Sequence, residues 1–140
     1  METVAANAQA IGNSLTDMTS RFKIVKEFGF EAAHTFSHKP AGHENTRVHG
    51  HSFKVEVALT GEPNEATGCV VDFEDLSRAL NLVRSKLDHH FLNDLPGLAT
   101  PSLENLSRWI AEQLRPDFPQ LAQVTVRRPS LGESCTFDVI

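Results

Sequence analysis

The sequence predicts an α+β domain in which two helices cover one face of a four-stranded antiparallel sheet. Apolar residues recur at every second position in four segments, which is the period of a half-buried strand. In two other segments they recur at every third or fourth position, which is the period of an amphipathic helix. The order is two strands, two helices and two strands, and helices grouped in this way pack on one face of an antiparallel sheet.

The chain is long enough to form one domain with its own core. It has 140 residues, 40% of them hydrophobic, and a formal net charge of -5. This acidic balance argues against nucleic acid as a partner, and no apolar run is long enough to predict a membrane span. We expect residues 1–20, rich in Ala, Asn, Ser and Thr, to be a flexible extension and residues 21–140 to form a single domain. Two cysteines and no signal-peptide pattern favour a cytoplasmic protein.

Two alternating segments predict the first half of the sheet. Residues 22–34 carry Phe28 and Phe30 on one parity, and residues 52–60 carry apolar side chains at odd positions. The intervening residues 35–47 have no period and contain proline and glycine. Loops of this length inside compact domains are usually functional, so we expect this loop to border the site.

Two segments with helical spacing predict the helices. Asp72 is expected to cap the first helix, which ends near Asp88. The second helix is expected to open around Thr100, with Pro101 in its first turn, where proline is favoured, and to end at Pro116. The apolar stripes of the two helices are predicted to contain Phe73, Leu76, Leu80, Val83 and Leu87, and Leu103, Leu106, Ile110 and Leu114.

The remaining segments complete the sheet. Residues 123–127 and 134–139 alternate again and predict a closing hairpin around residues 129–132. Residues 69–71, Cys-Val-Val, follow a turn region and predict a short buried segment.

Three histidines stand out as candidate metal ligands. His49 and His51 lie two residues apart at the start of a strand, so their side chains share a face. His34 ends the preceding strand, and a hairpin would bring it to the other two. Three neutral histidines with an open fourth position form the arrangement of catalytic zinc, whereas structural zinc sites are closed and usually rich in cysteine. The alternative is an ordinary pair of polar side chains at the edge of a sheet.

Five separated motifs follow one another along the chain. They are Phe30–His34 (FEAAH), His49–Phe53 (HGHSF), Leu87–Asp94 (LDHHFLND), Glu104–Leu106 (ENL) and Glu133–Ser134 (ES). In this order they resemble the 6-pyruvoyl-tetrahydropterin synthase family, and within it most of all the bacterial 6-carboxy-5,6,7,8-tetrahydropterin synthases of queuosine biosynthesis. The similarity runs from about Phe22 to the C-terminus.

The resemblance implies a tunnelling fold (T-fold) and a homo-oligomer. In this family the four-stranded sheets of three subunits join edge to edge into a barrel, two trimers stack into a hexamer, and the active site lies between subunits. This implication agrees with a physical requirement, because a small open sheet has unpaired edges and closing a barrel removes them.

The resemblance also assigns roles to residues. It implies one Zn²⁺ per subunit on His34, His49 and His51, and a lyase that converts 7,8-dihydroneopterin triphosphate to 6-carboxy-5,6,7,8-tetrahydropterin. Asp88 and His89 match the proton relay of the family; on their own they would suggest a helix end with a solvated acid.

The pterin-binding positions are carried over in the same way. Glu133 resembles the glutamate that anchors the pterin ring, although a plain turn residue is the alternative. The start of the second helix also touches the pterin in the family, which implies contacts at Ser102 and Leu103. Because Leu103 stands where a small hydroxyl residue is common, only a backbone contact carries over there.

One position departs from the family. The catalytic cysteine lies four residues before the first histidine of His-Gly-His, and here that residue is Asn45, whose amide cannot act as a titrating base. Glu44 and the loop histidines 38 and 43 are the alternatives, because Cys69 and Cys135 are expected in core-like strands, where thiols are usually inert. A synthase forming the pyruvoyl product, an aldolase-like pterin enzyme and a weakly catalytic pterin-binding protein therefore remain open.

Overall fold

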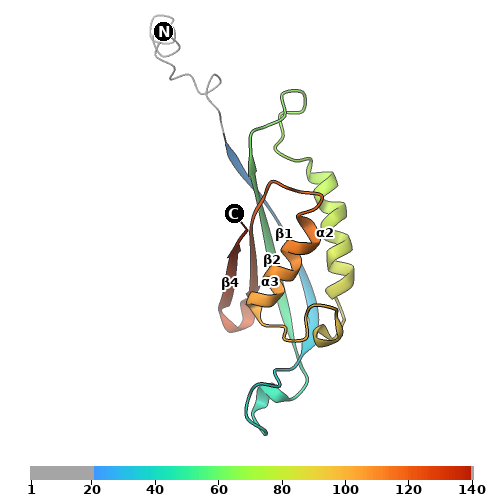
Figure 1. The fold of residues 1–140 in the computed structure, drawn as a ribbon, viewed down its shortest axis with the longest axis vertical. Helices are drawn as coiled ribbons and strands as arrows, with labels where there is room; N and C mark the ends of the chain where they lie inside the picture. The colour runs from blue at the N-terminus through green and yellow to red at the C-terminus, as the bar shows by residue number, and fades with distance from the viewer. Residues whose placement is uncertain (1–20, 140) are drawn as a thin grey trace, which may run out of the picture.

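The computed structural model describes residues 21–139, so the predicted flexible extension at residues 1–20 lies outside the described residues. Four strands form one antiparallel sheet in the order β1-β2-β3-β4, with β1 spanning Phe22–His34, β2 His49–Gly61, β3 Leu121–Arg128 and β4 Glu133–Asp138. Figure 1 shows α2 and α3 in front of the same face of this sheet. The predicted α+β plan is therefore confirmed.

Both predicted helices form, and a side chain caps each at its start. Helix α2 spans Phe73–Leu87, and the carboxylate of Asp72 accepts a hydrogen bond of 2.8 Å from the N–H of Glu74. Helix α3 spans Leu103–Leu114, and the Ser102 hydroxyl accepts one of 3.1 Å from the N–H of Asn105. The prediction that Pro101 lies in the first turn is wrong, because Ser102 is the cap and the proline precedes it.

The core lies between the helices and one face of the sheet. Leu76, Leu80, Leu106 and Ile110 of the helices are at most 2% exposed, as is Val55 of β2. The rings of Phe30 and Phe53 stack across β1 and β2 with centroids 4.9 Å apart. The predicted apolar stripes are confirmed except at Phe73, which begins α2 and is 46% exposed. The residues of β1 and β2 that face the helices are the even residues of β1 and the odd residues of β2.

The predicted buried segment at residues 69–71 is wrong. Cys69 is exposed in a turn, where its N–H donates to the hydroxyl of Thr67 and its carbonyl accepts from the N–H of Asn64. Gly68 precedes it with φ +73, a left-handed conformation that ends any extended run. Three apolar residues are too short a pattern to distinguish a strand from a turn that packs one side.

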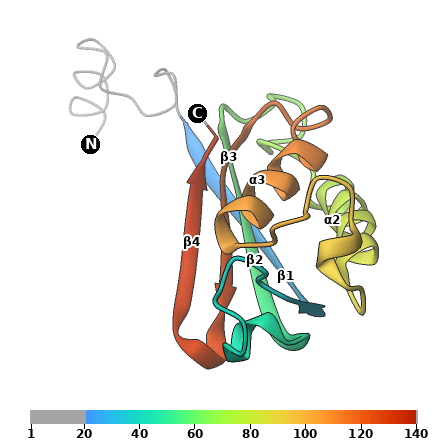
Figure 2. The same cartoon turned by 60° about the horizontal axis from the view of Figure 1, so that its bottom comes forward.

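The two outer strands of the sheet are covered to different extents. The segment after α2 runs along β1, where the N–H of His89 donates to Glu31 and the N–H of Ala33 donates to His90. Within the described residues, no backbone hydrogen bond covers the outer edge of β1 between Phe22 and Glu27 or that of β4. Figure 2 shows β4 at one side of the sheet, where α3 is the helix that contacts it, with Arg108 over the ring of Phe137. No helix in the described part of the chain is long and apolar enough to cross a bilayer.

Candidate metal centre and active site

The three predicted ligands converge at one end of the β1–β2 pair. His34 is the cross-strand partner of His49, and His51 follows two residues later on the same face. The Nε2 atoms of His34 and His49 are 3.0 Å apart, and one nitrogen from each of the three rings lies within 4.8 Å of the others. The hairpin predicted from the sequence thus forms, and its register brings the three histidines together.

Hydrogen bonds outside the cluster orient the rings. Nδ1 of His49 lies 2.8 Å from the carbonyl oxygen of Arg47, so it carries the proton and leaves the lone pair of Nε2 facing His34. The carbonyl of Pro101 faces the ring of His34, although the buried Nδ1 has no hydrogen bond of good geometry. A ligating histidine usually donates its other N–H to such a carbonyl, so both contacts are suited to hold metal ligands.

Burial and nearby charges favour the neutral form of His34 and His51. Burial, then the neighbouring His49, His51 and Arg128, lowers the pKa of His34 to about 4. Burial also lowers the pKa of His51, followed by Arg128 and His49. Neutral imidazole is the form that binds metal, so these rings are ready to coordinate near pH 7.

The donor set fits zinc. In a tetrahedral site with Zn–N bonds of about 2.0–2.1 Å, ligand nitrogens lie roughly 3.3 Å apart, close to the observed Nε2 separation. His34 is fully buried, while His49 and His51 are partly exposed, so a ligand has access from the side of β2. Phe36 and Phe53 pack on the ring of His34 with centroids 4.6 and 6.0 Å away, which gives the centre an apolar wall.

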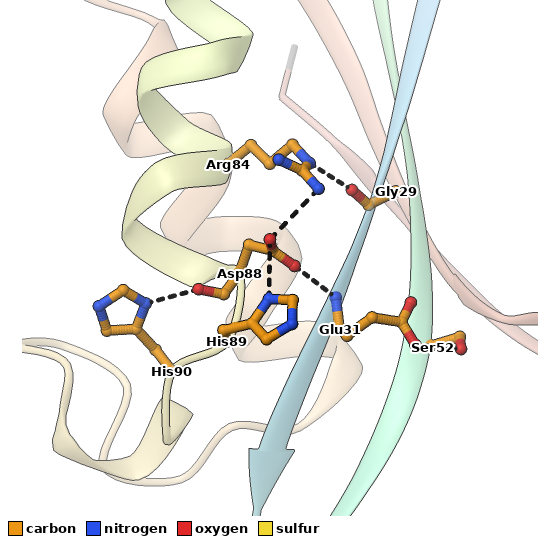
Figure 3. A network of polar contacts seen from close by, with 7 residues as sticks. All are labelled: Gly29, Glu31, Ser52, Arg84, Asp88, His89 and His90. Carbon is orange, nitrogen blue, oxygen red and sulfur yellow. Dashed lines mark hydrogen bonds and ion pairs between the residues drawn. The ribbon is translucent and has the colours of Figure 1, made fainter.

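Asp88 and His89, the predicted proton relay, lie in contact at the C-terminal end of α2 (Figure 3). Oδ2 of Asp88 lies 2.9 Å from Nδ1 of His89 and 3.2 Å from Nη2 of Arg84, and Oδ1 accepts a hydrogen bond of 2.9 Å from the N–H of Glu31. That backbone N–H and then His89 lower the pKa of Asp88, so the carboxylate stays ionised. His89 has φ 59, a left-handed conformation that is uncommon outside glycine, and its side chain is 78% exposed.

The relay pair and the histidine cluster are not in contact within one chain. No hydrogen bond or ring contact in the described residues joins His89 to the three histidines. A hollow of about 500 Å³ lies beside His89. Most of the strand residues that line it belong to the sheet face opposite to the cluster, although His51 also borders it. The lining residues are Glu31, Ala32, Ala33, Gly50, His51, Ser52, His89, His90 and Phe91.

The predicted pterin-binding residues lie near the cluster. Glu133 begins β4, and its half-exposed carboxylate raises the pKa of His51 against the larger lowering effects. Ser102 caps α3 with its hydroxyl, its carbonyl accepts from the N–H of Leu106, and its N–H donates to Thr100. Leu103 is 7% exposed in the core, so among the described residues only its N–H is left without a hydrogen bond. Because the Pro101 carbonyl faces His34, the start of α3 lies beside the centre.

The loop that contains Asn45 is hydrogen-bonded to the residues that follow β1. The carbonyl of Asn45 accepts a hydrogen bond of 2.8 Å from the N–H of Phe36, and the hydroxyl of Thr35 donates to the carbonyl of Thr46 at 2.7 Å. Glu44 is exposed, and the Asn45 N–H donates to Nδ1 of His43 at 3.0 Å. Cys69 is exposed, which corrects its predicted core position, and Cys135 is half-buried in β4.

Sequence reasoning missed one residue of this region, Arg128. It stands two residues after Val126, on the core-facing parity of β3, and an arginine at a core-facing position was the available signal. Its charge contributes to the lowered pKa of His34 and of His51.

Comparison with known proteins gives one family. The family model described as 6-pyruvoyl tetrahydropterin synthase matches residues 23–138. The chain is 42% identical over 98 residues to the 6-carboxy-5,6,7,8-tetrahydropterin synthase of Synechocystis sp., covering 65% of this chain and 73% of that protein. It is 34% identical over 117 residues to the dihydroneopterin monophosphate aldolase of Pyrococcus furiosus, covering 84% and 94%.

A solved structure agrees. The 6-pyruvoyl tetrahydropterin synthase of Caenorhabditis elegans superposes with a TM-score of 0.75 at 25% identity, over 87% of this chain and 98% of that one. With the family model spanning nearly all of the described residues, the chain belongs to the 6-pyruvoyl tetrahydropterin synthase family.

Proposed function

We propose that the chain is a zinc-dependent lyase that converts 7,8-dihydroneopterin triphosphate to 6-carboxy-5,6,7,8-tetrahydropterin. The observation that carries the proposal is the cluster of three imidazoles, whose ligand nitrogens lie within 4.8 Å of one another. The Synechocystis relative, at 42% identity, is named for this product. The pterin is the small-molecule partner, and the reaction needs no nucleic acid or membrane.

His34, His49 and His51 would hold the zinc ion. Bound there, zinc lowers the pKa of a coordinated hydroxyl and polarises a neighbouring carbonyl, which is the chemistry that moving protons along the side chain of the pterin requires. The apolar wall of Phe36 and Phe53 limits water around the ligand and strengthens electrostatic interactions with it.

Asp88 and His89 would move the protons. The ionised Asp88 accepts the Nδ1–H of His89, which leaves Nε2 of the exposed ring free to take a proton and later return it. Because this pair does not contact the cluster of its own chain, we place it against the ligand at a neighbouring subunit's centre. The active form is then a homo-oligomer, a trimer or a hexamer, with its active sites between subunits.

Glu133 would orient the pterin. A carboxylate accepts two hydrogen bonds from the ring N–H and the amino group, which fixes the plane of the ring. At the start of α3 the N–H of Leu103 offers a further contact to the same ring, and Ser102 holds that turn in place.

A second candidate is an aldolase-like reaction. It is favoured by the Pyrococcus furiosus aldolase, which matches 84% of this chain, and by the amide of Asn45 at the cysteine position. Both candidate reactions remove two of the three side-chain carbons. The lyase leaves a carboxylate on the pterin, and the aldolase leaves a hydroxymethyl group.

Product analysis tests the proposal. The zinc-loaded protein is incubated with 7,8-dihydroneopterin triphosphate, and the products are identified by mass, with His51→Ala as the inactive control. We expect the 6-carboxy product. A 6-hydroxymethyl product would establish the aldolase, a 6-pyruvoyl product would establish the synthase, and unchanged substrate would leave only a binding function.

A further inference from the structure

Arg128 lies on the same face of the sheet as the histidine cluster. The register of β2 and β3 pairs Lys54 with Arg127, and one step further along places Arg128 opposite Phe53. The ring of Phe53 is 5.8 Å from that of His51 and 6.0 Å from that of His34. Arg128 is thus the next core-facing residue beside the cluster, and its charge is felt by both rings.

The guanidinium of Arg128 is only partly used by the protein. Its side chain is 14% exposed, and Nε lies 3.0 Å from Oε1 of Glu133, its cross-strand partner on β4. This contact is an ion pair without hydrogen-bond geometry, because the buried Nε–H does not point at that oxygen. Within residues 21–139 no hydrogen bond joins the two terminal nitrogens to another residue, and unlike Nε they are not shut off from solvent.

A buried cation beside a metal centre needs a reason. Burying an arginine is costly unless it is paired, and a bound dication would repel it further. Glu133 offsets the charge from one side, but the two terminal nitrogens still present coplanar donors in a fixed fork. Such a fork matches a carboxylate in bidentate fashion.

We propose that Arg128 is a specificity-determining residue whose terminal nitrogens bind the carboxylate of a pterin ligand held at the three-histidine centre. The inference rests on the proposed function, since it takes the ligand to be a pterin. A phosphate could supply similar anionic oxygens, but the triphosphate lies at the far end of the side chain from the ring. The carboxylate is attached directly to the ring, so it lies beside the metal when the ring is anchored. Arg128 therefore favours the 6-carboxy product over a 6-hydroxymethyl product.

The proposal is tested by binding two pterins that differ only in this group. Dissociation constants of 6-carboxypterin and 6-hydroxymethylpterin are measured by fluorescence titration of the zinc-loaded protein. In Arg128→Ala we expect the affinity for 6-carboxypterin to fall by roughly 10- to 100-fold, as for a lost charge-assisted bidentate contact, and that for 6-hydroxymethylpterin to change by less than about threefold. Arg128→Lys should lose part of the affinity, because it keeps the charge but not the fork.

Arg127→Ala is the matched control. Arg127 is the neighbouring residue on the opposite face of β3, where it pairs with Glu56 at 2.8 Å, so its loss should change neither affinity. Zinc content and melting temperature show that each variant is folded; if Arg128→Ala is not, Arg128→Lys carries the test.

Three outcomes would overturn the assignment. Equal loss of affinity for both pterins would make Arg128 a structural residue. Weaker binding of inorganic phosphate with unchanged binding of 6-carboxypterin would make it a phosphate site. Unchanged affinity for both pterins in Arg128→Ala would refute this inference alone. A wild-type protein that binds neither pterin would instead refute the proposed function itself.

Discussion

The close contact of His34 and His49 requires that the two rings are not both protonated. Nε2 of His34 is 3.0 Å from Nε2 of His49, and two protonated rings at this distance would repel each other strongly. Burial and the mutual proximity of the rings lower the pKa of His34 to about 4, so they coexist at neutral pH.

Removal of one ligand should abolish metal binding. His51→Ala leaves two ligands of the cluster, and we expect zinc content to fall from about one ion per chain to near zero, because even outer-shell changes weaken metal sites by about 10- to 100-fold. Metal analysis after dialysis measures this. The control His90→Ala, whose ring bonds only the carbonyl of Asp88, should keep its zinc. Full activity in a metal-free protein would contradict the zinc assignment.

The metal-free protein should lose stability in mild acid through His34. The unfolded chain binds a proton on this residue below its ordinary pKa of 6.5, whereas the native protein does so only near pH 4. The unfolded state therefore holds more protons between these values, and the free energy of unfolding falls as pH drops, by at most about 3 kcal/mol from this group. Urea unfolding at pH 7 and pH 4.5 measures it. The same slope in His34→Ala would show that other groups are responsible.

The loop residue Asn45 limits catalysis if no other side chain supplies the base. Proton transfer by a positioned side chain contributes roughly 10² to 10⁴ in rate, so Asn45→Cys should raise turnover by a measurable part of that range. Glu133→Ala should instead weaken pterin binding, because the ring contact exists in ground and transition states alike. Steady-state kinetics separate the two effects. Unchanged turnover in Asn45→Cys, with activity abolished in Glu44→Gln, would assign the base to Glu44.

At the scale of elements, Asp88 joins α2 to the edge of β1. It follows the last residue of the helix, and its carboxylate contacts Arg84 in the last turn, the N–H of Glu31 and the ring of His89. Arg84 in turn donates to the carbonyl of Gly29 at 2.8 Å, as Figure 3 shows. The same carboxylate thus fixes the helix end and orients the imidazole.

Asp88→Asn should separate these two tasks. The amide oxygen can still accept from the N–H of Glu31, so we expect the free energy of unfolding to change little. Loss of the negative charge should lower kcat by roughly 10²- to 10⁴-fold, because His89 is no longer stabilised as a cation. Asp75→Asn, on the exposed side of α2, is the control. A kcat unchanged by Asp88→Asn would exclude the relay.

At the scale of the whole molecule, the open sheet edges predict assembly. On the outer edge of β1, the N–H groups of Glu31 and Ala33 are hydrogen-bonded to the segment after α2. The N–H of Val25 faces the same way, and it has no hydrogen-bond partner among the described residues. Val25 is also 44% exposed. Exposed strand edges of this kind pair with other chains unless they are blocked.

Light scattering should therefore give a trimer or a hexamer at micromolar concentration. Val25→Pro removes an outward N–H without breaking a bond of the β1–β2 ladder, so we expect it to shift the mass toward the monomer while the helical circular dichroism is kept. Val25→Ala is the control and should stay assembled. A monomeric wild-type protein would refute both the assembly and the active site between subunits.

Local patterns determined much of this protein. The alternation in residues 22–34 and 52–60 fixed which face of each strand is buried, and with it the common face of His34, His49 and His51, because side-chain direction in a strand depends only on parity. Caps and apolar spacing likewise predicted both helices, since these signals act within one or two turns. The family motifs then added the roles of Asp88, His89 and Glu133, which the residues alone left open.

Only the tertiary structure decided how these parts meet. The antiparallel register sets His34 against His49, and it depends on a loop whose shape the sequence does not give. The ion pair of Arg128 with Glu133 depends in the same way on the turn between β3 and β4. The exposure of Cys69 also depended on packing, because three apolar residues carry too little pattern to choose between a strand and a turn. The separation of His89 from the cluster arises because the chain after α2 pairs with the edge of β1, a contact between segments about 57 residues apart that no local periodicity encodes.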